Sequence, residues 1–147
     1  MELLKVSGIC KKGQDDFALQ DISFTQSDGE RIAIAGETGS GKTTLLKIIA
    51  GLIQPEAGSV LFNGQKVIGP LDQLIPGHRH IAYLSQHFEL RNNYRVEEIL
   101  SYANKLPVTG AEKLYAVCRI DHLLKRKTDQ LSGGEKQRIA MARLLIG

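Results

Sequence analysis

The first half of the chain is dominated by short apolar runs and by alternation of apolar and polar residues. Residues 3–9 form a mostly apolar run, and residues 17–25 alternate between the two types, although the period slips at residues 20–21. Alternation with a period of two is typical of a half-buried β-strand, because successive side chains point to opposite faces of a sheet. The slip predicts a bend or a β-bulge in the second strand.

Three later segments also have strand character. Residues 59–67 contain Asn63-Gly64 between two apolar stretches, and this dipeptide is the strongest short-range signal for a β-hairpin. Residues 31–35 and 80–84 are short, mostly apolar runs. Such runs are typical of strands that are buried on both faces of a parallel sheet.

Helical periodicity appears first in residues 42–50 and dominates towards the C-terminus. Residues 96–105 and 111–124 carry apolar side chains at intervals of three and four, as amphipathic helices do. A last helix is expected after Ser132, because Ser132 and Glu135 have the spacing of a capping box. This order of elements predicts an α/β domain with a helical insertion.

Composition and charge fit a soluble globular protein and argue against several other classes. The chain has 147 residues, 42% apolar and 24% charged, which suits one domain with a sizeable core. A net charge of +3 and one short basic run, residues 125–127, give little reason to expect a nucleic-acid partner. Cys10 and Cys118 stand far apart and lack metal-like spacing. This argues against a disulfide framework and fits a reducing cytosol. No signal peptide or membrane-spanning run is apparent, so a membrane role would require a partner.

The clearest chemical signal is a glycine-rich loop at residues 36–43, between a predicted strand and a predicted helix. It matches the pattern G-x-x-x-x-G-K-[ST] at every fixed position. Glycines allow the tight curl that turns successive backbone N–H groups towards phosphate oxygens, and the helix that follows adds the positive end of its dipole. We therefore expect the chain to bind the triphosphate of ATP, with the Lys42 ammonium near the β- and γ-phosphates and the Thr43 hydroxyl on Mg²⁺.

The expected ATP-binding residues form one continuous segment. They are Gly36, Glu37, Thr38, Gly39, Ser40, Gly41, Lys42, Thr43 and Thr44. The side chains of Glu37, Thr38 and Ser40 occupy variable positions of the pattern, where a solvent-exposed loop residue is an equal alternative. Thr44 fits an ordinary helix residue better than a ligand, although it could reach the α-phosphate.

A second motif lies close to the C-terminus. The run Leu131, Ser132, Gly133, Gly134, Glu135 opens the last predicted helix and offers a second anion-binding helix start. One nucleotide hardly needs two such starts unless they belong to different subunits. Alone, the motif would equally suit an ordinary capped helix.

Taken together, these motifs resemble the ATP-binding domain of ABC transporters. The phosphate loop is followed by Ser85-Gln86 and then by the Leu-Ser-Gly-Gly-Glu motif, and the resemblance runs from Leu3 to Gly147. It implies an α/β fold with a P-loop NTPase core, which has an incomplete, mostly parallel sheet, N-terminal antiparallel β elements and a helical subdomain. The domains expected on this basis are a core at residues 1–89, a helical subdomain at 90–130 and a signature segment at 131–147.

The resemblance also implies partners and residue roles. Two such domains would pack head to tail, so that the signature residues 131–135 face the ATP bound by the partner domain. Gln86 would contribute, together with Lys42, to the reaction and would sense Mg²⁺ with Thr43. Transmembrane transporter subunits are the other expected partners, which would make the protein a cytoplasmic subunit peripheral to the membrane. No nucleic acid is expected.

Two departures from the family pattern affect function. The strand that ends in Asp-Glu, which supplies catalytic carboxylates in the family, is not found before Gly147. We therefore expect a fragment that binds ATP, hydrolyses little of it and self-associates through exposed edges, whereas its parent is an ATPase. The adenine-stacking aromatic residue of the family is replaced by Cys10, and Phe17 is the nearest aromatic residue, although a core position suits it better.

Three functions are compatible with these motifs. The first is the ATP-binding subunit of an ABC transporter, in which ATP binding closes the domain dimer and hydrolysis reopens it. The second is a non-transport ABC-type ATPase, such as a ribosome-associated translation factor. The third is an ATP-binding regulatory module that does not hydrolyse ATP. Neither the transported substrate nor the direction of transport can be inferred from these residues.

Overall fold

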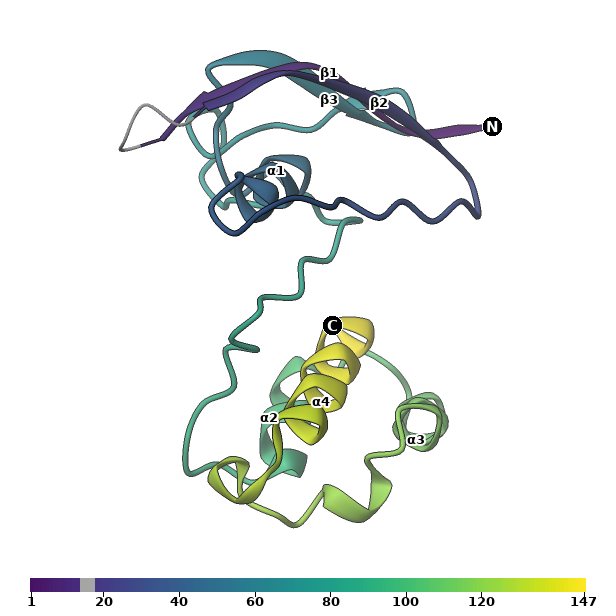
Figure 1. Ribbon diagram of the computed structural model, residues 1–147. Coiled ribbons are helices and arrows are strands. Elements are labelled where there is room, and N and C mark those ends of the chain that lie inside the picture. The colour runs from purple at the N-terminus through teal and green to yellow at the C-terminus, as the bar shows by residue number, and fades with distance from the viewer. Residues whose placement is uncertain (14–17) are drawn as a thin grey trace. The chain divides into compact units, whose positions relative to one another are not determined.

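The computed structural model describes residues 1–13 and 18–147, and this part of the chain divides into two compact units. Unit 1 comprises Met1–Tyr83 and unit 2 comprises Leu84–Gly147. Strands and one helix make up unit 1, whereas unit 2 is helical (Figure 1). Each unit has a hydrophobic cluster of its own. The domain boundaries expected from the sequence stay a prediction.

Unit 1 is an antiparallel sheet with one helix against its face (Figure 1). The strands lie in the order β2-β1-β3-β4, and their bounds are β1 Glu2–Lys12, β2 Ala18–Ser27, β3 Ala57–Phe62 and β4 Gln65–Lys66. Helix α1, Lys42–Ile49, buries Leu45, Ile48 and Ile49 against Val6 and Val60 of the sheet. The phosphate loop therefore leads into the only helix of the described part of this unit.

The slip in the alternation of residues 17–25 corresponds to a bulge in β2. Ile9 pairs with Ile22 and Lys11 pairs with Leu19, so that β2 has one residue more than β1 between these pairs. Asp21 has a φ of 48°, and its N–H donates to the Cys10 sulfur at 3.4 Å. The expected bulge is confirmed.

The expected hairpin is also confirmed. Strands β3 and β4 are joined by Asn63 and Gly64, whose φ angles are 49° and 74°. Positive φ at both central residues belongs to the type I′ turn, which matches the right-handed twist of the two strands. The Val67 N–H donates to the Val60 C=O at 2.9 Å, which extends the pairing beyond the turn.

Helix α1 ends in a Schellman motif at Gly51. The Gly51 N–H donates to the Ile48 C=O at 3.0 Å, and the Leu52 N–H donates to the Lys47 C=O at 2.8 Å. These bonds require a left-handed residue after the helix, and Gly51 has a φ of 74°. The glycine expected to stop this helix therefore does so.

Unit 2 contains three α-helices and two short 3-10 helices among its described residues. Their bounds are α2 Val96–Ala103, α3 Val108–Val117, η1 Asp121–Leu123, η2 Thr128–Gln130 and α4 Gly133–Ile146. The sequence predicted one helix over residues 111–124, but Arg119, with a φ of 54°, separates α3 from η1. Leu100, Leu123 and Ile139 are fully buried in the cluster that joins α2, η1 and α4.

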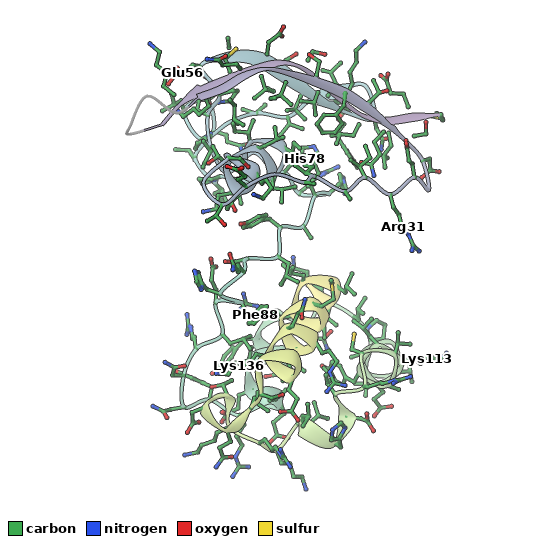
Figure 2. All side chains as sticks on the ribbon, viewed as in Figure 1. Arg31, Glu56, His78, Phe88, Lys113 and Lys136 are labelled. Carbon is green, nitrogen blue, oxygen red and sulfur yellow. The ribbon has the colours of Figure 1, made fainter. Side chains whose placement is uncertain are left out.

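The two parallel strands expected at residues 31–35 and 80–84 do not form. Both segments are irregular, and all of residues 31–35 except Ile34 are exposed. Arg31 extends into solvent (Figure 2). A strand needs a hydrogen-bonded neighbour on at least one side, and neither segment has one within the described residues. Each segment still contributes one partly buried side chain, because Ile34 and Ile81 pack against the core of unit 1.

Candidate nucleotide-binding site

The phosphate loop has the backbone conformation that its glycines predict. Gly39 and Gly41 have φ angles of 86° and 82°, values that residues with a side chain rarely adopt. Gly41 is the N-cap of α1, and no side chain caps the helix there. The Gly41 C=O accepts the first helical bond from the Leu45 N–H at 2.9 Å. The N–H groups of the first turn have no acceptor within the helix, so they are available to an anion.

The Lys42 side chain folds back over the loop. Its ammonium donates to the C=O groups of Gly36 at 2.8 Å and Glu37 at 2.5 Å, and it lies 3.2 Å from the Ser40 hydroxyl oxygen. The positive charge is therefore held at the mouth of the loop, where phosphate oxygens would replace weaker neutral acceptors. The hydroxyl of Ser40 is a contact that the sequence did not reveal, because Ser40 occupies a variable position of the motif.

Close approach of backbone and side chain explains Gly36. A β-carbon at this position would come within 2.7 Å of the Ser40 hydroxyl oxygen and within 3.9 Å of the Lys42 Cδ. Any larger residue would enter the space that Ser40 and Lys42 share. A β-carbon there would require the Ser40 hydroxyl to turn away. A cradle that is open at the backbone and carries one cation fits a polyphosphate.

Few groups near the phosphate loop could bind Mg²⁺. Thr43 is exposed in the first turn of α1, and Thr44 is partly buried one residue further on. Among the residues that the structure describes, no three His, Cys, Asp or Glu side chains gather into a metal site. The residues present thus fit a Mg²⁺ ion that arrives with ATP, since Mg²⁺ is usually held by one or two protein groups plus substrate phosphates and water.

Gln86 belongs to unit 2, whereas the phosphate loop belongs to unit 1. It is exposed at the start of a turn in which Phe88 and Glu89 have φ angles of 58° and 47°. The Phe88 N–H donates to the Ser85 C=O at 3.1 Å and closes this turn. The turn presents Gln86 to solvent, and its expected role towards Mg²⁺ stays a prediction.

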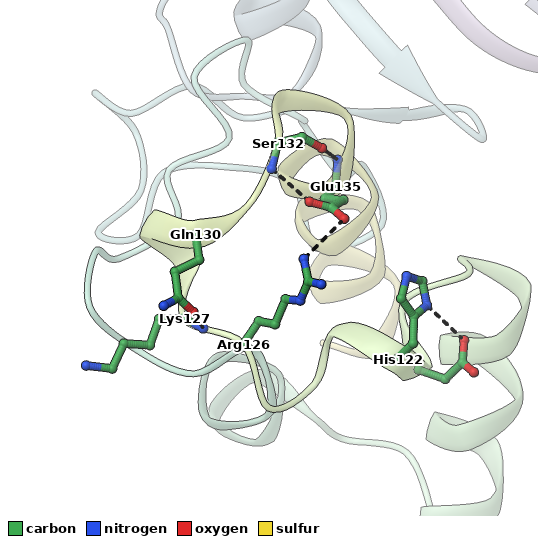
Figure 3. A network of polar contacts seen from close by, with 7 residues as sticks. His122, Arg126, Lys127, Gln130, Ser132 and Glu135 are labelled. Carbon is green, nitrogen blue, oxygen red and sulfur yellow. Dashed lines mark hydrogen bonds and ion pairs between the residues drawn. The ribbon is translucent and has the colours of Figure 1, made fainter.

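The second motif forms a closed helix start (Figure 3). The Ser132 N–H donates to a Glu135 carboxylate oxygen at 2.8 Å, and the Glu135 N–H donates to the Ser132 hydroxyl at 3.3 Å. This is the capping box that the sequence predicted. The Ser132 N–H lowers the pKa of the Glu135 carboxyl, and the Ser132 hydroxyl and the guanidinium of Arg126, 4.0 Å away, add to the lowering. Gly133 and Gly134 are exposed in the first turn.

The candidate adenine contacts are less well defined. Cys10 is partly buried in β1, where its sulfur accepts the Asp21 N–H. Phe17 lies outside the described residues. Strand β1 contains no aromatic residue, so Cys10 offers a small apolar surface but no ring on which a base could stack.

Comparison with known proteins identifies the class. Residues 19–147 match the family described as ABC transporter, and the chain belongs to this family. The molybdate/tungstate import ATP-binding protein WtpC of Thermococcus kodakarensis is 40% identical over 150 residues, which cover 97% of this chain and 44% of that protein. The sulfate/thiosulfate import ATP-binding protein CysA of Bradyrhizobium diazoefficiens is 36% identical over 155 residues, which cover 97% of this chain and 43% of that protein.

Solved structures agree on the fold. A structure described as the ATP binding subunit of an ABC transporter superposes with a TM-score of 0.79 at 26% identity and covers 98% of this chain and 62% of its own length. The α/β class with a P-loop core is thereby confirmed. The chain spans less than half the length of the curated relatives described above. None of its described helices is long and apolar enough to cross a membrane.

Proposed function

We propose that this chain is the ATP-binding part of an ABC-type importer. The observation that carries the proposal is the open N-terminus of α1, with left-handed glycines before it and the Lys42 ammonium held over the loop by neutral acceptors. This helix start has N–H donors without an acceptor in the helix, a cation beside them and no acidic residue in its first turn, so it fits the triphosphate of ATP. The similar proteins named as import ATP-binding proteins support the direction of transport.

Each residue of the loop then has a defined task. The backbone N–H groups of residues 41–43 orient the phosphates, and the Lys42 ammonium moves from the loop carbonyls to the β- and γ-phosphate oxygens. Ser40 holds Lys42 near the loop before ATP arrives. Mg²⁺ bound with ATP would neutralise phosphate charge, and the Thr43 hydroxyl and the Gln86 side chain would hold it.

The signature segment acts on a different nucleotide in this proposal. The segment Ser132 to Gly134 contacts the ATP of a second nucleotide-binding domain in a head-to-tail dimer. Transmembrane subunits couple the closure of this dimer to transport. The relatives differ in the substrate that their names give, from molybdate/tungstate to sn-glycerol-3-phosphate and methionine, at 36–40% identity. These residues therefore do not determine the transported substrate, which other subunits select.

ATP binding with and without Mg²⁺ tests this proposal. Replacing Lys42 with Ala removes a charge-assisted contact, and we expect the affinity for ATP to fall about 10- to 100-fold. Lys5→Ala is the matched control, because Lys5 is an exposed lysine on β1 outside the loop. Isothermal titration calorimetry on the whole chain measures both variants.

The outcomes separate the steps of the proposal. Equal affinities of the Lys42→Ala and Lys5→Ala variants would remove the phosphate loop from the binding site. No binding by any variant, including the unaltered chain, would show that the loop cannot hold ATP in this chain. Turnover of ATP in the same preparation tests the separate prediction that this chain hydrolyses little of it.

A further inference from the structure

A short segment of unit 1 is held against the C-terminal end of α1 shortly before the chain passes to unit 2. The Gly77 N–H donates to the Gly51 C=O at 3.0 Å. The His78 N–H donates to the Ala50 C=O at 2.9 Å, and His78 lies beside this end of the helix (Figure 2). Unit 1 ends at Tyr83. The two bonds therefore hold the segment that leads out of unit 1 on the helix whose other end carries the phosphate loop.

The neutral form of the His78 imidazole stabilises this segment. Its Nδ1 accepts the His80 N–H at 3.3 Å, and a ring nitrogen that accepts a hydrogen bond carries no proton. The ring also packs edge-on against the ring of Phe62, with 5.3 Å between the centroids. Phe62 is partly buried against the core of unit 1. A proton on Nδ1 would break the bond to the His80 N–H and place a charge beside the Phe62 ring.

The neighbours of His78 disfavour this proton. Arg79 and His80 are both basic, and the Arg79 Nε–H donates to the His80 Nε2 at 2.8 Å, which keeps the guanidinium within the cluster. Among the residues that the structure describes, no carboxylate forms an ion pair with either histidine. Burial lowers the pKa of His78 from its ordinary value of 6.5, and the nearby His80 and Arg79 lower it further.

The end of α1 acts in the opposite direction, but only weakly. Carbonyl groups at the C-terminal end of a helix favour a nearby cation. Here the Ala50 and Gly51 carbonyls already accept N–H groups of the segment, and the last turn of α1 carries a cation of its own, Lys47. Strand β3 contacts the ring through Phe62, which adds no charge. The balance of these groups favours neutral His78, in agreement with its lowered pKa.

We propose that His78 is a pH-sensitive anchor of residues 77–81. Its neutral imidazole holds this segment on the end of α1, and a proton on Nδ1 releases it. Release adds residues 77–83 to the connection between the two units, so that acidification loosens this connection. The anchor lies at the opposite end of α1 from the phosphate loop, and it does not depend on the proposed function.

Titration of the histidine rings, followed by NMR on the whole chain, tests the charge state. A lowered pKa means that the anchored state binds the proton less tightly than the released state. Anchoring is therefore complete above about pH 6.5 and is lost as the pH falls from there through the lowered pKa. We expect a midpoint below 6.5 for His78. Arg79→Gln removes a neighbouring cation and should raise this midpoint, whereas Arg31→Gln, an exposed change elsewhere in unit 1, should leave it in place.

Hydrogen exchange of the amides at positions 77 and 78 measures the release itself. We expect their protection factors, corrected for the intrinsic effect of pH, to fall about fivefold between about pH 7.5 and about pH 5.0, which is the factor that one net hydrogen bond contributes. His78→Asn keeps an acceptor oxygen near the position of Nδ1 but does not titrate, so protection should change by less than about twofold. His122→Asn, an exposed change in unit 2, should retain the fall.

Three results would overturn the proposal. The first is a His78 midpoint at or above 6.5, and the second is a midpoint that Arg79→Gln does not raise. The third is a fall in protection that is absent from the unaltered chain or equally large in His78→Asn. If His78→Asn does not fold, as circular dichroism would show, the Arg79→Gln titration and the exchange of the unaltered chain decide.

Discussion

Each unit contains a helix that begins at a glycine-rich motif, and the two helix starts are completed in opposite ways. At α1, the N-cap is Gly41 with a φ of 82°, no side chain caps the helix and the first turn has no acidic residue. At α4, the Ser132 hydroxyl accepts from the Glu135 N–H and the Glu135 carboxylate accepts from the Ser132 N–H. These bonds place a carboxylate at the positive end of the helix. One start is open to an external anion, and the other supplies its own.

This difference explains why similar motifs have different chemistry. The donors of an open start are satisfied from outside the helix, so in the proposed function α1 binds phosphate directly. A closed start is stable without a ligand, and what remains available at α4 is the exposed Gly133-Gly134 backbone. We therefore expect the first turn of α1 to gain hydrogen bonds when ATP binds, whereas the first turn of α4 has its cap without a nucleotide.

The largest expected effect tests whether each unit depends on its own core. Leu100, 0% exposed on α2, packs in the cluster of unit 2. We expect Leu100→Ala to lower the free energy of unfolding of that unit by about 2–5 kcal/mol, because it leaves a cavity. Hydrogen exchange should show faster exchange in unit 2 and unchanged protection of the β1–β3 amides.

The control for this prediction lies on the same helix. Tyr102 is 83% exposed, and Tyr102→Ala should change stability by less than about 0.5 kcal/mol. Equal loss of protection in both units of the Leu100→Ala variant would show that they unfold as one body, and the comparison would then not hold.

A smaller effect tests the sheet that supports the open start. Gly58 has a φ of 88°, and a β-carbon there would overlap the backbone of Gly8 in β1. Gly64 has a φ of 74°, but nothing lies within 4 Å of the added atom. We expect Gly58→Ala to destabilise unit 1 by about 3 kcal/mol and Gly64→Ala by about 1 kcal/mol. Urea denaturation measures both, and similar values would mean that β1 and β3 can separate locally without cost.

The closed start of α4 can be opened by one substitution. Ser132→Ala removes the acceptor of the Glu135 N–H, and we expect a loss of about 1 kcal/mol in the stability of unit 2. Ser132→Asp keeps an acceptor at the N-cap and should retain most of the stability. Thermal unfolding followed by circular dichroism measures both variants. If Ser132→Ala were as stable as the unaltered chain, α4 would not depend on its capping box.

The smallest expected effect concerns pH. The folded state lowers the pKa of Glu135 from its ordinary value of 4.5, so its contribution to stability is present above about pH 4.5 and is lost as the pH falls through the lowered pKa. Glu135→Gln should therefore flatten the acid limb of the stability curve of unit 2. Glu112→Gln, an exposed change on α3, should leave the curve as it is. Parallel curves for Glu135→Gln and the unaltered chain would contradict a role for this carboxylate.

Local signals predicted the features that depend on a few neighbouring residues. The sequence predicted the hairpin turn at Asn63-Gly64, a bend or bulge near residues 20–21, the stop of α1 at Gly51 and the capping box of α4. In the turn, the helix stop and the capping box, a backbone conformation is fixed by a glycine, an asparagine or a side chain within three residues. The bulge was indicated by a slip in the alternation of apolar and polar residues. The phosphate loop belongs to the same group, because its shape and its chemistry come from one continuous segment.

The sequence by itself therefore determined the family, the phosphate loop and the local starts and stops of the elements. Only the tertiary structure decided that residues 31–35 and 80–84 form no strand in this chain and that Arg95 lies opposite Lys127. The physical reason is that a strand and a cross-strand pair both need a partner segment from elsewhere in the same chain. The apolar character of one segment does not show whether that partner is in place.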